Sequence, residues 1–300
     1  MNIEKLEKLR KIAYTIQLIG FICTALLSIV ILITTKAILL VIITMIIGLT
    51  FTALCSSFPT RKFTSEYKKT LVFSALKTIF TDLTYEPERG LAKSVIENTG
   101  MMDLGDRYSS NDYISGKYKN VSVIQADVHI EERTESTDFD DDDSTDTDWD
   151  TIFQGRWMVF DFNKSFKYNL QVCQKGFYNS IIDNWKSNIK FKNITLEDQE
   201  FNKQFKVYAQ NEQEAFYILT PAMMEKIKKL SNNINGEILL CFIDNKLHVG
   251  IENYDDAFEP SIFVKVNETK AKEKILKDIK LITDFIDELD LDNDLFKVEV

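Results

Sequence analysis

Two long uncharged runs near the N-terminus limit the possible folds of this chain more than any other feature. Residues 13–33 read AYTIQLIGFICTALLSIVILI and residues 37–58 read AILLVIITMIIGLTFTALCSSF. A helix needs roughly 20 apolar residues to cross the hydrocarbon core of a bilayer, and it satisfies its own backbone hydrogen bonds there. Because only Thr34-Thr35-Lys36 separates the runs, they predict a tight transmembrane hairpin.

Two other interpretations of these runs are weaker. A signal peptide would explain the basic residues before residue 13, but the first run is too long for an h-region and no cleavage site of small residues follows it. A buried helix pair of a soluble protein would have to cover two uncharged helices almost completely. The hairpin is therefore the favoured interpretation.

The distribution of charge predicts the orientation of the hairpin. Residues 1–62 hold seven bases and two acids, a net charge of +5, and the remainder carries −15. Four bases precede the first run and four follow the second closely, whereas the connection holds only Lys36. Because loops rich in Lys and Arg stay in the cytoplasm, we expect a multi-pass inner (plasma) membrane protein with a basic N-terminus, residues 1–12, and with both termini cytoplasmic.

Composition also bears on the partners of the chain. Nucleic-acid binding needs a basic face on the folded domain, so the acidic body argues against nucleic acid, while the lipid bilayer is the expected partner of residues 13–58. The four cysteines (Cys23, Cys55, Cys173 and Cys241) lie far apart without a CxxC pair. This spacing is typical of unpaired thiols in a reducing compartment.

The rest of the chain predicts a juxtamembrane helical segment, residues 59–100, and an α+β domain, residues 101–300. An apolar stripe marks a helix over 65–83, and Thr220-Pro221 and residues 267–289 mark two further helices. Strands are expected at 151–162, paired with 168–174, and at 205–210. Hairpins are expected at 112–118 with 121–131, and at 237–243 with 246–251, turning at Asp244-Asn245. Because strands and helices do not alternate regularly, a mostly antiparallel sheet is favoured.

Several fragments resemble a known family. The strings YEPERG, SSNDYISGKY, FQGRWMVFDFNKSF, EFNKQFKVYAQNEQEAFYILTPAMMEKI and FIDNKLHVGI follow the two apolar runs in that order. They resemble a bacterial two-span membrane protein family whose cytoplasmic domain carries only a domain-of-unknown-function label. The resemblance implies a bacterial inner-membrane protein, and it brings no catalytic residue that could be carried over.

The stretch EERTESTDFDDDDSTDTDWD, residues 131–150, holds eleven acids and one base. It predicts a disordered acidic loop over 132–150, joining a strand that ends near Ile130 to one that begins near Ile152. Asp141-x-Asp143 lacks the preceding apolar strand of an aspartate phosphohydrolase. The calcium-loop glycine is replaced by Thr151 after Asp146-x-Asp148-x-Asp150, and by Leu295 after Asp290-x-Asp292-x-Asp294. No metal site is predicted.

No catalytic residue or cofactor site is predicted either. His129 and His248 have no second histidine at ligand spacing, and each is interpreted as a surface or edge histidine. GxSxG, GxxxxGK[ST] and GxGxxG motifs are absent. The aromatic residues around 153–168 and 201–217 are interpreted mainly as core, with a peptide or lipid groove as the alternative.

The sequence thus favours a membrane-anchored cytoplasmic binding or scaffold protein, whose partner is another protein or a second copy of the chain. The alternative is a membrane-associated enzyme that uses acidic side chains in a cleft, such as Asp112, Asp161 or Glu259. A channel or transporter component is the weakest hypothesis, because the two runs carry no acid or base.

Overall fold

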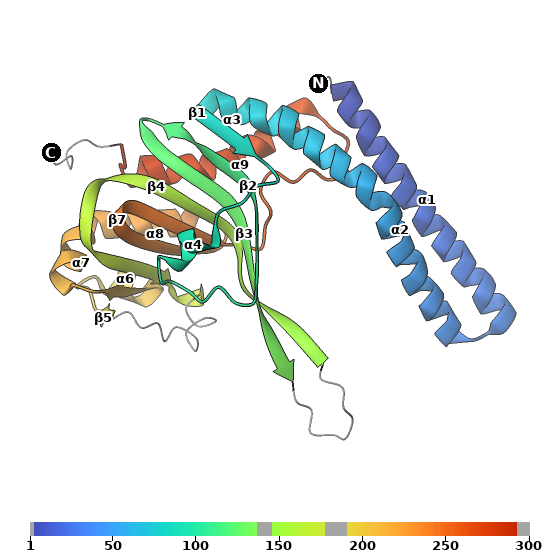
Figure 1. Cartoon of the computed structure of the whole chain (residues 1–300), viewed down its shortest axis with the longest axis horizontal. Coiled ribbons are helices and arrows are strands. Elements are labelled where there is room, and N and C mark those ends of the chain that lie inside the picture. Colours follow the sequence, from blue (N-terminus) through green and yellow to red (C-terminus); the bar gives the residue numbers. More distant parts are fainter. Residues whose placement is uncertain (1–2, 137–145, 178–190, 293–300) are drawn as a thin grey trace. The chain divides into compact units, whose positions relative to one another are not determined.

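The computed structural model describes residues 3–136, 146–177 and 191–292 of the chain, which Figure 1 shows as a ribbon. The chain divides into two units. The first comprises Met1–Ala75 and Phe258–Leu276, and the second comprises Leu76–Ala257 and Lys277–Val300. A segment from late in the sequence therefore belongs to the unit of the N-terminal helices, which the order of the sequence does not predict.

The two apolar runs form the helices α1 (Ile3–Thr35) and α2 (Ile38–Tyr67). Lys36 lies in the connection with a positive φ of 54°. Both helices are long and apolar enough to cross a membrane. The predicted spans 13–33 and 37–58 lie within them, and α2 continues through Pro59 without ending.

Small residues form the seam between α1 and α2. A Cβ added to Gly20 would lie 2.3 Å from Cγ2 of Thr52, and one added to Gly48 would lie 2.4 Å from Cγ2 of Thr24. Each helix thus places a glycine and a threonine four residues apart, and each glycine faces the threonine of the other helix. Small residues at this spacing let the backbones of membrane helices approach closely.

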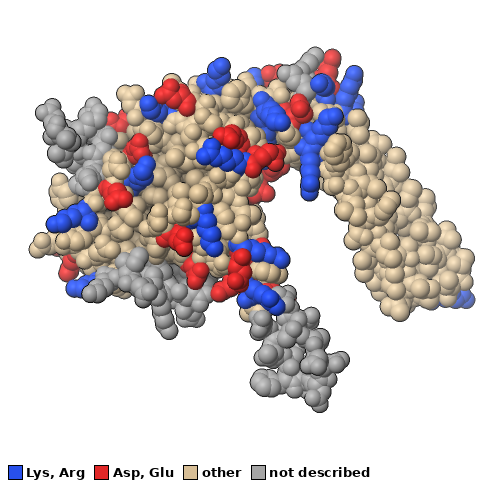
Figure 2. All heavy atoms as spheres, viewed as in Figure 1, with Lys and Arg blue, Asp and Glu red and all other residues tan. Residues whose placement is uncertain are grey.

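The remaining surface of the helix pair is apolar and exposed. Large side chains such as Leu26, Ile33, Ile47 and Leu54 project outward on both helices. Figure 2 shows the pair as an uncharged surface over most of its length, with charged side chains at one end and a single small blue patch at the tip. The core helix of a soluble protein would be mostly buried, so this exposure agrees with helices that face lipid.

The juxtamembrane helix differs from its predicted extent. After α2 the chain forms one π-helical turn, η1 (Lys68–Val72), and then α3 (Phe73–Ile79). The predicted helix over 65–83 is wrong at its C-terminal end, because Thr81–Glu86 form the strand β1. β1 pairs with β2 (Arg107–Tyr118), and this non-local pairing overrides the helical periodicity of residues 79–83.

The strands form a mostly antiparallel sheet, as predicted for an α+β domain. Within the described residues the sheet has seven strands, of which six follow the order β1-β2-β3-β4-β6-β5 and the seventh, β7, pairs with β4. The further strands are β3 (Val121–Ser136), β4 (Asp146–Gln174), β5 (Lys192–Ile194), β6 (Phe205–Ala209) and β7 (Glu237–Glu252). Every pairing in this sheet is antiparallel.

One predicted pairing is wrong. Residues 151–162 and 168–174 both belong to β4, and instead of pairing with each other they pair with the two halves of β7. The predicted hairpin of 237–243 and 246–251 is confirmed, because Gly250 lies against Leu239 and Gly236 against Glu252, so the chain reverses between the two halves of β7. Asp244, with a positive φ of 54°, lies at this turn.

The two ends of β7 come together because the chain reverses at Asp244. A Cβ on Gly236 would lie 2.4 Å from the carbonyl oxygen of Glu252. A Cβ on Gly250 would lie 2.9 Å from Cζ3 of Trp157 and 3.1 Å from Cδ1 of Leu239. The two halves of β7 therefore meet beside Trp157, and glycine is needed where the chain passes this closely.

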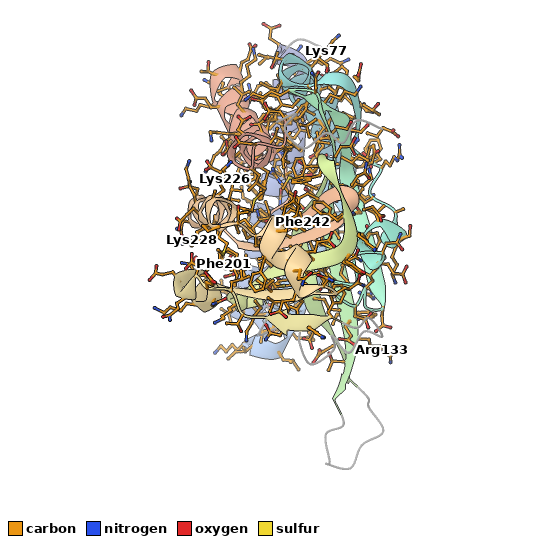
Figure 3. The ribbon with its side chains drawn as sticks, turned by 90° about the vertical axis from the view of Figure 1, so that its left-hand side faces the viewer. Lys77, Arg133, Phe201, Lys226, Lys228 and Phe242 are labelled. Atoms are coloured by element: carbon orange, nitrogen blue, oxygen red, sulfur yellow. The ribbon has the colours of Figure 1, made fainter. Side chains whose placement is uncertain are left out.

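Two layers cover the sheet. Residues 91–104, with α4 (Lys93–Glu97), pack on the face that carries Ala126, Phe153 and Trp157. Helices α6 (Gln199–Gln204), α7 (Glu212–Ile218) and α8 (Pro221–Asn233) follow in sequence. Figure 3 shows Phe201 and Phe242 inside the domain, with Lys226 and Lys228 of α8 nearer its outer side.

Two predicted helices are confirmed. α8 begins at Pro221 after the N-cap Thr220, whose Oγ1 accepts a hydrogen bond from the Met223 amide at 3.3 Å. α9 (Glu268–Glu288) matches the predicted 267–289 closely. Its predicted apolar side is buried, and the ring of Phe285 stacks on Phe160 at a centroid distance of 6.1 Å.

The hairpin of β2 and β3 is confirmed, and it extends further than predicted. Lys119 and Asn120 have positive φ values of 47° and 65°, as a two-residue turn of type I′ requires. The expected disordered loop over 132–150 is wrong at both ends, because Glu132–Ser136 pair with Asp146–Asp150. Residues 137–145 lie outside the described residues.

Candidate functional site

A buried ionic cluster lies between the sheet and α9. Arg156 of β4 donates to the carbonyl oxygen of Asp278 at 2.6 Å, and its Nη2 lies 3.3 Å from Oδ1 of the same residue. Its Nε lies 4.0 Å from Oδ1 of Asp127, the cross-strand neighbour on β3. The other oxygen of Asp127 accepts from the amide of Ala257 at 2.6 Å. The cluster therefore joins β3, β4, the segment that follows β7, and α9.

Asp112 stands beside this cluster on β2. It has a positive φ of 56°, and its carboxylate accepts hydrogen bonds from the hydroxyl of Tyr85 and from the side-chain Nδ2 of Asn111, each at 2.8 Å. Its own amide donates to the carbonyl oxygen of Pro87 at 2.9 Å. These bonds fix the unusual backbone at the register shift of β2.

Burial raises the pKa of Asp127 to about 7, and the nearby Asp112 carboxylate adds to the rise. Arg156 acts in the opposite direction. Its guanidinium nitrogen is too far from Oδ1, at 4.0 Å, for a hydrogen bond. The attraction therefore offsets only part of the cost of placing a carboxylate in a low-dielectric interior.

The cluster is closed to solvent. The side chains of Arg156 and Asp127 are 4% and 3% exposed, so a substrate cannot reach either group in this conformation. The role that the arrangement supports is to position the backbone of neighbouring segments. It holds the segment after β7 and the middle of α9 against the sheet.

A second group of ionisable residues lies on β7. His248 is buried, and its Nδ1 is 3.5 Å from the indole nitrogen of Trp157. Burial lowers the pKa of His248 to about 4, and Lys246 contributes. Burial raises the pKa of Glu252, the last residue of β7, to about 7, and a hydrogen bond with Tyr254 acts in the opposite direction. At neutral pH His248 is uncharged, which suits its place beside Trp157.

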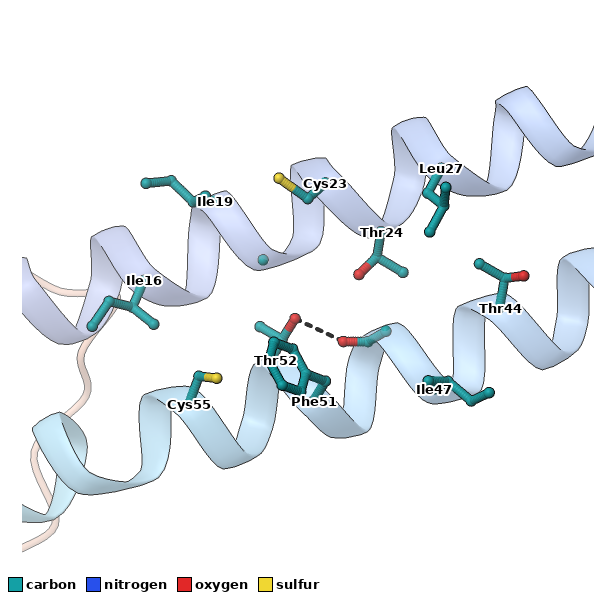
Figure 4. A pocket seen from close by; sticks show the side chains of 12 residues that line it. Ile16, Ile19, Cys23, Thr24, Leu27, Thr44, Ile47, Phe51, Thr52 and Cys55 are labelled. Atoms are coloured by element: carbon teal, nitrogen blue, oxygen red, sulfur yellow. Dashed lines mark hydrogen bonds between the residues drawn. The ribbon is translucent and has the colours of Figure 1, made fainter.

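Two cavities lie between α1 and α2, with volumes of ≈ 570 Å³ and ≈ 360 Å³. Figure 4 shows the larger one, lined by Cys23 and Thr24 of α1 and by Phe51 and Cys55 of α2 among others. The dashed bond runs from the hydroxyl of Thr52 to the carbonyl oxygen of Gly48, at 2.8 Å. The lining is almost wholly apolar, so these cavities suit hydrocarbon better than a polar substrate.

Comparison with protein families finds one match for this part of the chain. A family model described as "Protein of unknown function (DUF3137)" matches residues 151–291. The DUF3137 match is confined to these residues. The match runs from β4 to the residues after α9, and it includes Arg156, His248 and Asp278. The predicted domain of unknown function is thus confirmed, over this part of the chain.

No curated protein matches the chain. Among solved structures, the crystal structure of the mycobacterial trehalose monomycolate transport factor A, TtfA, is similar at 11% sequence identity and a TM-score of 0.37. The likeness covers 75% of this chain and 96% of that chain. A likeness of this degree carries no conclusion about the DUF3137 domain.

The three acids suggested for an enzyme do not form one cluster. Asp112 is buried among its hydrogen bonds, and Asp161 pairs with Lys246 of β7 at 3.1 Å. Glu259 pairs with Lys68, within the unit of the helix pair. Among the described residues, no group of three or more His, Cys, Asp or Glu side chains could hold a metal ion.

The two histidines differ from each other. His129 is partly exposed on β3, as predicted, with Nε2 4.0 Å from Glu131. The prediction of a surface position for His248 is wrong, because it is buried. Its strand is covered on both faces, so the alternation of KLHVGI does not mark a solvent side.

The aspartate motifs have different outcomes. Asp146, Asp148 and Asp150 lie on β4, where an extended strand cannot wrap around an ion. Asp290 forms an ion pair with Lys226. Asp141, Asp143 and Asp294 lie outside the described residues.

Sequence reasoning missed Asp127 and Arg156. Each is a lone charge inside a strongly apolar strand, in SVIQADVHI and in FQGRWMVF. A charged residue is rarely buried without a partner. Two such charges on neighbouring strands of the sheet are therefore the signal that could have predicted their pairing.

Proposed function

We propose that this chain is a membrane-anchored cytoplasmic binding or scaffold protein of a bacterial inner membrane. The observation that carries the proposal is the exposed, uncharged surface of α1 and α2. Such a surface is unstable in water and is satisfied by lipid. Residues 13–33 and 37–58 would span the bilayer, and residues 59–300 would form the cytoplasmic part.

Exposed bases support this orientation. Lys5, Lys8 and Lys11 precede the first span, and Arg61, Lys62 and Lys69 follow the second. Arg10 adds less, because Glu7 neutralises it at 2.8 Å. The connection between the spans holds Lys36 alone. This asymmetry keeps both termini in the cytoplasm.

Binding is favoured over catalysis because the acids suggested for an enzyme are engaged in local structure. Asp161 and Glu259 form ion pairs, and Asp112 fixes a strained turn of β2. Aromatic side chains are also exposed on the domain. Phe216 and Tyr217 are neighbours on α7, and both are exposed.

Reporter fusions test the orientation. A phosphatase that is active only outside the cytoplasm is fused after Val300, and in a matched second fusion it is inserted at Lys36. We expect activity from the Lys36 insertion alone. Activity from the Val300 fusion would contradict the proposed orientation.

Site-directed photocrosslinking tests the binding role. A photoreactive amino acid replaces Tyr217 in living cells, and a second variant carries it at Tyr254, another exposed tyrosine. A binding protein should give a discrete adduct at Tyr217, with another protein or with a second copy. If neither position gives an adduct above the background of unirradiated cells, the scaffold role is wrong.

A further inference from the structure

The segment after β7 returns to the first turns of α1. Arg10 donates a buried hydrogen bond to the carbonyl oxygen of Ile262 at 2.6 Å. The ring of Phe263 meets that of Tyr14 edge-on, at a centroid distance of 6.3 Å. Since Tyr14 lies one helical turn beyond Arg10, Phe263 lies beside the start of the uncharged run.

Two further contacts hold this segment in place. The amide of Val266 donates to Glu7 at 3.0 Å, and Glu259 forms an ion pair with Lys68 of η1. The segment is thus fastened at both ends, to α1 and to the helical stretch that continues α2. Its tip is held in a defined position before any partner binds.

The tip exposes two large apolar side chains. Phe263 and Val264 are 62% and 63% exposed, whereas the preceding Ile262 is only 7% exposed. Burial of Ile262 shows that the segment can place an apolar side chain inward. The two that follow point outward, next to the apolar surface of the helix pair.

The charges around the tip are basic. Lys265 follows Val264 directly, and Lys11 lies on α1 between Arg10 and the uncharged run, both exposed. The acids of the segment and of the adjoining helix turn, Glu259 and Glu7, are already engaged by Lys68 and Arg10. Basic and aromatic side chains at the end of a span are typical of the membrane interface.

We propose that Phe263 and Val264 insert into the bilayer at the boundary of headgroups and acyl chains, as a third membrane contact beside the two spans. Lys265 and Lys11 then lie at the level of anionic headgroups. This inference rests on the proposed membrane anchoring. It adds that the segment before α9 is tied to the lipid surface as well as to α1.

Tryptophan fluorescence in the full-length protein tests the insertion. F263W and V264W are compared with Y217W, which replaces a tyrosine that is also 62% exposed but lies on α7. Each variant is reconstituted in vesicles of phosphatidylglycerol and phosphatidylcholine brominated on its acyl chains. The signal of the native tryptophans is subtracted with the unsubstituted protein.

Insertion predicts that brominated lipid quenches F263W and V264W, and that aqueous iodide does not. Y217W should behave in the opposite way. If both loop variants are quenched by iodide and not by brominated lipid, while the protein floats with the vesicles and resists alkaline carbonate, the insertion is wrong and the anchoring stands. Protein that fails to float with the vesicles would overturn the anchoring and the insertion together.

Discussion

Asp127 shows how one residue can couple the stability of the domain to pH. Its pKa is raised to about 7 in the folded chain, against about 3.9 in an unfolded one. Between these values the folded state keeps a proton that the unfolded state has released. Its contribution to the free energy of unfolding is therefore present below about pH 4 and is lost as the pH rises toward 7.

We predict that Asp127→Asn flattens this dependence. Asparagine keeps an oxygen for the Ala257 amide and does not titrate, so the unfolding temperature of the variant should fall less between pH 4 and 7 than that of the unsubstituted protein. Thermal denaturation of the full chain in detergent, followed by circular dichroism, measures the effect. Near pH 4 the two proteins should agree, since Asp127 is then neutral.

Two other residues affect the same measurement. Glu252, whose pKa is also about 7, acts with the same sign, so Glu252→Gln serves as a second positive variant. His248 has a pKa lowered to about 4 and acts with the opposite sign, because the unfolded chain binds its proton below about 6.5. Unchanged curves for both carboxylate variants would show that neither group titrates as inferred.

At the scale of elements, the seam of α1 and α2 depends on which residue faces which. Gly48 lies against Thr24 and Gly20 against Thr52, so each small residue makes room for a larger one. Among the described contacts, no network of hydrogen bonds between side chains links the two helices across this seam. The close approach itself is what stabilises the pair.

Gly48→Thr should therefore destabilise the helix pair, by about 1–3 kcal/mol as for overpacked sites in general. The exchange Thr24→Gly with Gly48→Thr restores one small and one large residue and should recover most of the loss. Thermal denaturation in detergent compares the single variant, the exchange and the unsubstituted protein. Equal stability of all three would mean that the seam is loosely packed.

The ends of β3 and β4 that pair beyond the predicted strands, Glu132–Ser136 and Asp146–Asp150, are called the arms here. They make contacts of their own outside the core. The guanidinium of Arg107 lies over the ring of Trp149 at 3.4 Å, and the hydroxyl of Thr134 donates to Asp150 at 2.6 Å. None of the core residues around Trp157 comes from these arms. From the acidic, polar sequence of residues 134–148 we predict that they can be deleted without loss of the fold.

A shorter replacement tests the arms more sharply. Since Ser136 pairs with Asp146, the nine residues between them can be replaced by the two-residue turn Asn-Gly. We expect an unfolding temperature close to that of the unsubstituted protein. The control is Trp149→Ala, which should lose up to about 1 kcal/mol through the contact with Arg107. A large loss on replacing the turn would mean that residues 137–145 contribute to the fold.

At the scale of the whole molecule, local sequence signals predicted most helices and turns. They failed where contacts between residues distant in the sequence determine the structure. Thr220-Pro221 begins a helix through its own chemistry, and the turn at Lys119-Asn120 needs only its two neighbours. Asp244-Asn245 likewise forms a turn, within β7, but no local signal predicts that both halves of this hairpin pair with β4. The pairing of Asp127 with Arg156, and the return of residues 258–276 to α1, are likewise properties of the assembled chain.

The return of the chain to α1 gives a prediction of its own. Arg10→Ala removes the hydrogen bond to Ile262 and the cation over the ring of Tyr14, and it leaves Glu7 without its nearest base. The segment 258–266 should then be cleaved faster by protease in the detergent-solubilised protein. Lys11→Ala, at the exposed neighbour, is the control and should not change the rate. Equal rates would show that Arg10 does not hold the segment.

The contact between Arg10 and Ile262 also has a consequence for the order of synthesis. The two residues are separated by 252 positions, which a ribosome needs on the order of 10 to 50 s to traverse. During that interval α1 and α2 can already be in the bilayer, while the partner of Arg10 does not yet exist. Until then Arg10 has Glu7, three residues before it on α1, as its charged partner. The contact that holds the segment after β7 therefore forms only after the helix pair has been made.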